Sequence, residues 1–166
     1  VGLQLDELST HLALQKWVDG GGDVTQRLGD LHSTILIEAA TVGDLEAVEY
    51  LHAAAPSTLD ATDDDQVTAL MAAASNGHAN VVRALLAAGA RADIRSSPSV
   101  AASFEVGGQT RPEFRALGLT ALQWAVAEGH DAVVGMLRAA AAHAYQLGDV
   151  VECLDTYGQW YPARII

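Results

Sequence analysis

One phrase is written twice in this chain, and it constrains the fold more than any other feature. Residues 68–78 read T-A-L-M-A-A-A-S-N-G-H, and residues 120–130 read T-A-L-Q-W-A-V-A-E-G-H. A weaker third copy begins at Thr34, and in all three copies a glycine follows the threonine by nine residues. Self-similarity of this kind indicates an array of stacked units rather than one closed globule.

The spacing of the copies defines the repeating unit. Gly43 and Gly77 lie 34 residues apart, whereas Gly77 and Gly129 lie 52 residues apart. The longer interval equals one period of ~33 residues plus an insertion of 19 residues, 96–114. A unit of this length, with a turn and two helices, resembles the ankyrin repeat, whose phrase is T-P-L-H-x-A-A-x-x-G-H.

The resemblance covers about residues 10–143 and implies a mostly α fold, an ankyrin-repeat solenoid of helix-turn-helix units. The chain departs from the family phrase at two positions, where proline and histidine are usual. At the proline position the chain has Ile35, Ala69 and Ala121, and at the histidine position it has Ile37, Met71 and Gln123. We therefore expect the hydrogen bonds that this histidine makes between repeats to be absent or replaced.

The repeated residues have structural roles. Thr68 and Thr120 are predicted N-caps, whose hydroxyl groups accept hydrogen bonds from free amides at a helix start. Gly77 and Gly129 are predicted to end the first helix of each unit, where a left-handed backbone favours glycine. Apolar residues such as Val81, Val82, Leu85 and Leu86 then form one face of a second helix.

The predicted organisation follows from this frame. A degenerate repeat comes first, with residues 3–18 expected to be helical. Three ankyrin repeats, the insertion and a C-terminal tail then follow. The predicted boundaries are 1–27 for the degenerate repeat, 28–62, 63–95 and 115–143 for the repeats, 96–114 for the insertion and 144–166 for the tail.

Charge is the first functional clue. The formal net charge is −12, and residues 28–82 contain acidic residues but no lysine or arginine. Such a surface repels phosphate backbones, so nucleic acid is not expected as a partner of the repeats. It favours a protein partner with a basic surface. The alternative is a solvated face that only keeps the array soluble.

The resemblance implies that partners bind the turn tips and the concave face of the first helices. An aspartate triplet precedes the Thr68 phrase and falls on such a tip. It lacks the alternating spacing and the distal glutamate of a calcium loop, so no metal is expected. The predicted contact residues are Asp63, Asp64, Asp65, Val67, Ser75 and Asn76 in one repeat, and Leu117, Leu119, Ala127 and Glu128 in the next.

The insertion is the second clue, because excursions from a repeat array often lie on its binding face. Gly107 and Gly108 lie between two short extended runs, which predicts a β-hairpin. We expect this loop to dock onto a partner, with Phe104, Arg111 and Phe114 as anchors. The alternative is that it folds back onto its own repeats.

The tail leaves the repeat pattern. Alternating apolar residues predict a strand over residues 150–154, followed by a turn. The tail resembles the opening hairpin of a Tudor-like or SH3-like barrel, which implies Tyr157, Trp160 and Tyr161 as candidates for an aromatic cage. The alternative is a terminal ankyrin helix pair, and a strand at 150–154 separates the two.

Motifs of catalysis are not found in the sequence. It has no glycine-rich phosphate loop and no nucleophile elbow. Its six histidines show no metal-ligand spacing, and its single cysteine, Cys153, forms no internal disulfide framework. We expect no enzymatic activity and no cofactor. No signal peptide or apolar span of ~20 residues is apparent, so we expect a soluble intracellular protein; its compartment is left open, with an organelle such as the chloroplast or mitochondrion as one alternative.

Three functions are compatible with these features. The first is an adaptor that binds a protein partner through its concave face, acidic turn tips and inserted loop. The alternative is a peripheral structural subunit, permanently bound in a large assembly. A third, weaker alternative is a reader of methylated peptides through the Tudor-like tail.

Overall fold

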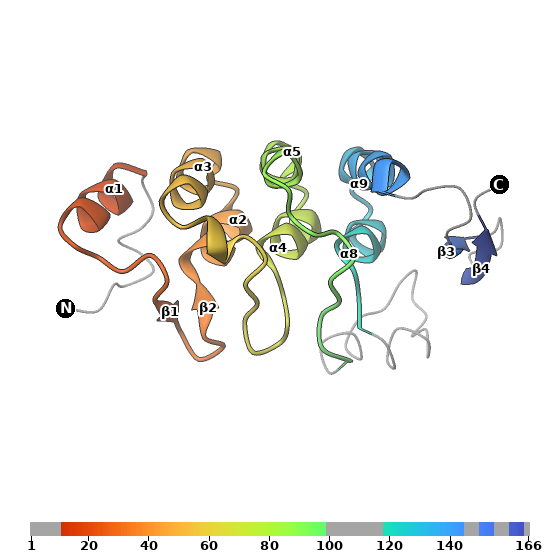
Figure 1. Ribbon diagram of the computed structural model, residues 1–166, viewed down its shortest axis with the longest axis horizontal. Helices are drawn as coiled ribbons and strands as arrows, with labels where there is room; N and C mark the ends of the chain where they lie inside the picture. The colour runs from red at the N-terminus through yellow and green to blue at the C-terminus, as the bar shows by residue number, and fades with distance from the viewer. Residues whose placement is uncertain (1–10, 99–117, 145–149, 155–159, 165–166) are drawn as a thin grey trace.

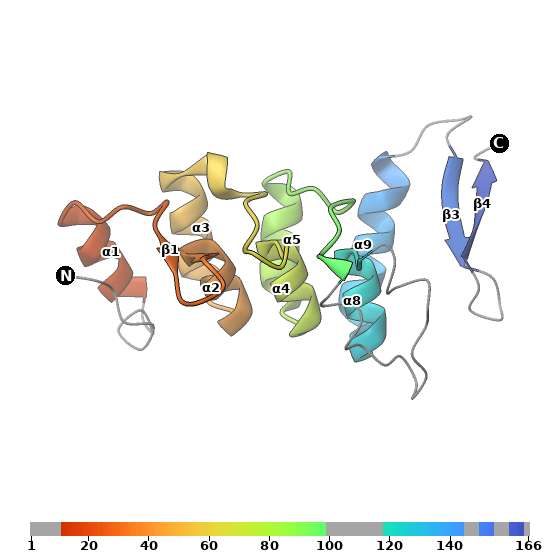
Figure 2. The same ribbon diagram turned by 90° about the horizontal axis from the view of Figure 1, so that it is seen from below.

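The computed structural model describes residues 11–98, 118–144, 150–154 and 160–164. After the single helix α1, the helices form pairs that lie side by side along the long axis (Figures 1 and 2). The helices are α1 (His11–Asp19), α2 (Ile35–Val42), α3 (Leu45–Ala54), α4 (Ala69–Ser75), α5 (Ala79–Ala87), α8 (Ala121–Glu128) and α9 (Asp131–Ala144). The strands are β1 (Arg27–Leu28), β2 (Ser33–Thr34), β3 (Val150–Leu154) and β4 (Trp160–Arg164), and a short 3-10 helix spans Pro56–Thr58.

The helix pairs pack in two rows. The first helices of the pairs form an inner row, in which α4 contacts both α2 and α8. The second helices form an outer row, in which α5 contacts both α3 and α9 (Figure 1). This mostly helical arrangement is the one that the repeated phrase predicts, with one copy of the phrase for each inner helix.

Capping residues set the ends of the inner helices. Thr34, Thr68 and Thr120 are extended N-caps, and the hydroxyl oxygen of each accepts a hydrogen bond from the amide three residues later. Gly43 and Gly129 have φ angles of 80° and 76° and end their helices in the left-handed region. The predicted caps Thr68, Thr120 and Gly129 are therefore confirmed, whereas α4 ends at the C-cap Asn76 and Gly77 follows it with a left-handed φ of 73°.

Small apolar side chains let the inner helices approach closely. Ala40, Ala73 and Ala125 are completely buried, and Leu36 and Leu70 are 1% exposed. The buried residues of all the helix pairs belong to one continuous hydrophobic cluster. A continuous core of this kind stabilises units that cannot bury their apolar faces alone.

The tail contains the predicted strand. β3 pairs with β4 in antiparallel register, with Val150 opposite Arg164 and Leu154 opposite Trp160. This pairing confirms a C-terminal hairpin and excludes the alternative of a terminal helix pair over these residues. At the other end, α1 begins at His11, and the rest of the predicted helix over residues 3–18 lies outside the described residues. No helix in the described part of the chain is long and apolar enough to cross a membrane.

Candidate partner interface

Three loops precede the inner helices and project to the same side of the stack, away from the outer row (Figure 1). We call them the first finger (residues 27–34), the second finger (residues 60–68) and the third finger (its described residues are 93–98 and 118–120). The predicted turn tip with its three aspartates belongs to the second finger.

Hydrogen bonds join the fingers to one another. The Asp64 amide of the second finger donates to the Leu31 carbonyl of the first finger, at 3.0 Å. On the other side, the Ser97 amide of the third finger donates to the Asp65 carbonyl, at 2.7 Å. The finger tips therefore form one continuous ridge.

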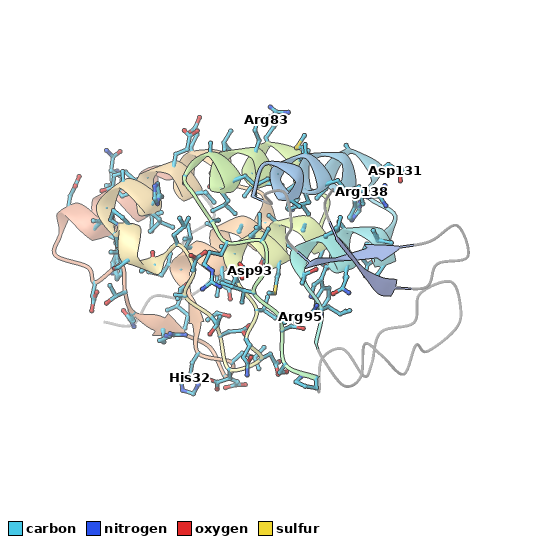
Figure 3. All side chains as sticks on the ribbon, turned by 45° about the vertical axis from the view of Figure 1, so that its right-hand side comes forward. His32, Arg83, Asp93, Arg95, Asp131 and Arg138 are labelled. Carbon is cyan, nitrogen blue, oxygen red and sulfur yellow. The ribbon has the colours of Figure 1, made fainter. Side chains whose placement is uncertain are left out.

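Side chains reinforce the joint between the first two fingers. His32 lies at the tip of the first finger (Figure 3), and its Nδ1 donates to the carboxylate of Asp64 at 2.8 Å. The guanidinium of Arg27 donates to the carbonyl of His32 at 3.0 Å and also to the carbonyl of Thr62. The first finger therefore places one arginine and one histidine beside the acidic triplet.

The three aspartates of the triplet occupy different environments. Asp64 is exposed, with 59% of its side chain accessible. Asp65 is half-buried, and its carboxylate accepts a hydrogen bond from the Ser97 hydroxyl at 3.4 Å. Leu31, the neighbour of His32, is 50% exposed and is one of two large exposed hydrophobic residues in the described part of the chain.

Asp63 faces inward, which corrects its prediction as a contact residue. It is 9% exposed, and its Oδ1 accepts hydrogen bonds from the amides of Asp65 and Val67 at 2.9 and 2.8 Å. Burial raises the pKa of this carboxyl, although the two amide hydrogen bonds act in the opposite direction. Asp63 shapes the second finger and leaves Asp64 and Asp65 closer to solvent.

Leu119 is a second correction, because it is fully buried in the core. Its amide donates to the Ser96 hydroxyl at 3.1 Å, and its carbonyl accepts from the Ser96 amide at 3.0 Å. The pairing holds the two described segments of the third finger together. Leu119 is therefore a structural residue at the base of the finger.

Of the other predicted contacts, four lie at the C-terminal ends of α4 and α8, and Val67 lies in the second finger. Asn76 and Glu128 are exposed, whereas Ser75, Ala127 and Val67 are half-buried. Val67 packs against the core, and the Asn76 amide group donates to the Ala72 carbonyl at 2.9 Å.

Two histidines join consecutive repeats. His78 Nε2 donates to the Thr41 carbonyl at 3.0 Å, and His130 Nε2 donates to the Ser75 carbonyl at 2.9 Å. Both histidines belong to the Gly-His end of the phrase, and the bonds expected from the other histidine of the phrase are absent. At that position Ile37 and Met71 are buried apolar residues, and Gln123 closes a capping box with Thr120. The repeated phrase contains both histidines, but it did not predict their partner carbonyls.

A family model described as ankyrin repeats, in three copies, matches residues 9–97 and 36–149. The matched spans cover more than half of the chain. The chain belongs to the ankyrin repeat family. Ankyrin repeats are generally protein–protein interaction modules and are generally not catalytic. A search of curated proteins found no match to this chain.

Several predicted site residues of this ankyrin repeat protein do not belong to the finger ridge. Trp160 and Tyr161 lie on β4, and no finding supports a Tudor-like barrel in the tail. In the part of the chain that the structure describes, no group of three or more His, Cys, Asp or Glu side chains could hold a metal ion. The remaining candidates lie outside the described residues: Phe104, Arg111, Phe114, Leu117 and Tyr157, together with the expected insertion hairpin.

Proposed function

We propose that the helix stack is a solenoid that binds a protein partner through its finger ridge and concave inner face. The observation that carries this proposal is the hydrogen-bonded ridge itself, which holds Leu31 and Asp64 exposed in adjacent fingers. A ridge whose fingers are tied together presents its side chains with little loss of conformational entropy on binding.

The chemistry of the ridge favours a basic partner with an apolar anchor. Residues 28–82 contain no lysine or arginine, so Arg27 and His32 are the basic groups that the first finger adds to the ridge. Exposed carboxylates attract a basic segment and speed its association. Leu31, which is 50% exposed, supplies apolar area beside the exposed carboxylate of Asp64.

The predicted insertion, residues 96–114, begins in the third finger, where Ser97 is hydrogen bonded to Asp65. We propose that residues 99–114 add contacts to a partner bound along the ridge. A variant that lacks these residues, with Ser96 and Leu119 retained, should bind the partner more weakly and keep its helical content. Unchanged affinity would favour an insertion that folds back on the repeats.

Selection from a random peptide library against the full chain tests the proposed surface. We expect the selected peptides to be rich in lysine or arginine, with at least one large apolar residue. Combining Leu31→Ala with Asp64→Asn should weaken their binding by about tenfold or more, because it removes an anchor and a charge from one site.

Glu49→Gln provides the matched control, because Glu49 is an exposed carboxylate on the outer helix α3. It removes the same charge as Asp64→Asn and should leave binding within about twofold. Selected peptides that are acidic, or that bind the double variant as tightly as the parent chain, would overturn the proposal. A partner that never dissociates during gel filtration would instead indicate a permanent subunit.

A further inference from the structure

The interface between consecutive repeats has the same parts at each of two junctions. A histidine ring of the following repeat lies over the glycine that ends the inner helix, and its Nε2 donates to the carbonyl two residues before that glycine. The first junction uses Gly43, Thr41 and His78, with a hydrogen bond of 3.0 Å. The second uses Gly77, Ser75 and His130, with a hydrogen bond of 2.9 Å.

The third repeat carries the acceptor half of this junction. Gly129 ends α8 with a φ of 76°, and Ala127 occupies the position of Thr41 and Ser75. A Cβ built on Gly43 or Gly77 would lie 2.6 or 2.7 Å from an imidazole nitrogen, whereas one built on Gly129 has no atom of the described residues within 4 Å.

Two apolar residues of α8 are also less buried than their counterparts in the earlier repeats. Leu122 and Val126 lie four residues apart and therefore on one face of α8. At the position of Leu122, the earlier repeats have Leu36 and Leu70, which are 1% exposed. At the position of Val126 they have Ala40 and Ala74, which are completely buried. Leu122 and Val126 are both partly exposed. Among the described residues, these two positions are therefore less buried at this end of the stack than at the other two junctions.

We propose that this end of the stack, formed by Leu122, Val126, Ala127 and Gly129, docks an ankyrin-type helix pair of another protein. The occupant must present a histidine at the start of its second helix, to donate to the Ala127 carbonyl and to lie over Gly129. It must also present small apolar residues to Leu122 and Val126. The interface would continue the repeat-to-repeat interface already present in the molecule.

Residues 145–166 and a second copy of the stack lack the histidine that this docking site requires. Residues 145–166 contain no histidine, so the tail cannot supply the imidazole. In a second copy, His78 and His130 already fill junctions, and Asp44 stands at the equivalent position of α3. A carboxylate there would face the Ala127 carbonyl, which is an acceptor, and could not donate a hydrogen bond.

A duplication of one repeat tests whether the end accepts a helix pair. In this variant, a second copy of residues 54–87, which contain α4 and α5, is inserted into α9 between Ala139 and Ala140. No native residue is removed, and the copy of His78 is placed to pack over Gly129. We expect amide hydrogen exchange in the last turn of α8 to slow by about tenfold or more. His78→Asp in the inserted copy alone should remove roughly fivefold of that protection. Unchanged exchange in α8 would overturn the proposal.

A photo-crosslinking amino acid at position 126 of the full chain, in an extract of the source cells, tests the identity of the occupant. We expect a cross-linked peptide from a different protein, with a Gly-His pair between two helices. The same amino acid at exposed Ala139 of α9 is the matched control and should not give it. A peptide from this chain, or no cross-link above the control, would overturn the proposal. The Leu31→Ala, Asp64→Asn variant should cross-link normally, which separates this site from the finger ridge.

Discussion

His130 Nε2 lies within hydrogen-bond distance, 2.9 Å, of the Ser75 carbonyl oxygen in the preceding repeat. The two residues are 55 positions apart, because the insertion separates their repeats. The bond and the ring that covers Gly77 join α8–α9 to α4–α5. Stability of a repeat array depends on such nearest-neighbour contacts.

We therefore expect His130→Ala to lower the free energy of unfolding by about 1–2 kcal/mol, through the lost hydrogen bond and ring packing. Urea unfolding followed by circular dichroism measures this change. His32→Ala is the matched control, since His32 is exposed at a finger tip (Figure 3), and its effect should stay within about 0.5 kcal/mol. Equal effects of the two substitutions would contradict the role assigned to His130.

Gly77→Ala should be more destabilising than Gly129→Ala. Both positions have left-handed backbones, with φ angles of 73° and 76°, so both variants have a strain of about 1–2 kcal/mol. Only at Gly77 does the new Cβ meet the His130 ring, at 2.7 Å. The difference between the two melting temperatures isolates this steric term. A larger effect at Gly129 would mean that the ring does not lie over Gly77.

Asp63→Ala should destabilise the second finger, because the amides of Asp65 and Val67 lose their acceptor. The expected cost is about 1–3 kcal/mol, whereas Asp64→Ala, at an exposed site, should cost less than ~1 kcal/mol. Comparison of both variants by urea unfolding checks this order. If Asp64→Ala has the larger effect, the assignment of Asp63 as the buried member of the triplet is wrong.

The titration of Asp63 gives a pH dependence of stability. Its pKa in the folded chain is raised by burial, so the unfolded chain releases this proton at a lower pH than the folded chain does. The contribution of Asp63 to the free energy of unfolding therefore falls as pH rises from the ordinary carboxyl pKa to the raised one, and is constant above it. Asp63→Asn should remove this fall. Parallel pH profiles for the parent chain and the variant would contradict it.

The capping box of α8 predicts a local effect. Thr120→Ala removes the side-chain acceptor for the Gln123 amide, and we expect a loss of about 1 kcal/mol. Thr41→Ala is a useful comparison, because its hydroxyl donates within α2 to the Ile37 carbonyl and caps no helix start. Thermal unfolding should show the smaller effect for Thr41→Ala.

The sequence was sufficient to predict the local structure of the repeats. Threonine caps and left-handed glycines act over one helical turn, so their positions in the phrase predicted where the inner helices begin and end. The strand at 150–154 was predicted in the same way, from alternation within five residues. These features depend on neighbours in the chain, which a single sequence displays.

The contacts between repeats were not predicted in detail. The acceptors of His78 and His130 are backbone carbonyls 37 and 55 residues away, and a backbone group carries no sequence signal. Asp63 and Asp64 have the same side chain, and the path of the backbone decides which one turns inward. Leu119 was predicted at a surface because the family position was carried over without its burial.

A hydrogen-exchange footprint of the full chain, free and saturated with a selected basic peptide, tests the central claim most directly. We predict that bound peptide slows exchange at the finger tips, around Leu31, Asp64 and Ser97, and leaves the outer helices α3 and α5 unchanged. Protection confined to the outer helices, or absent from all three fingers, would contradict the proposal that the finger ridge is the partner-binding surface.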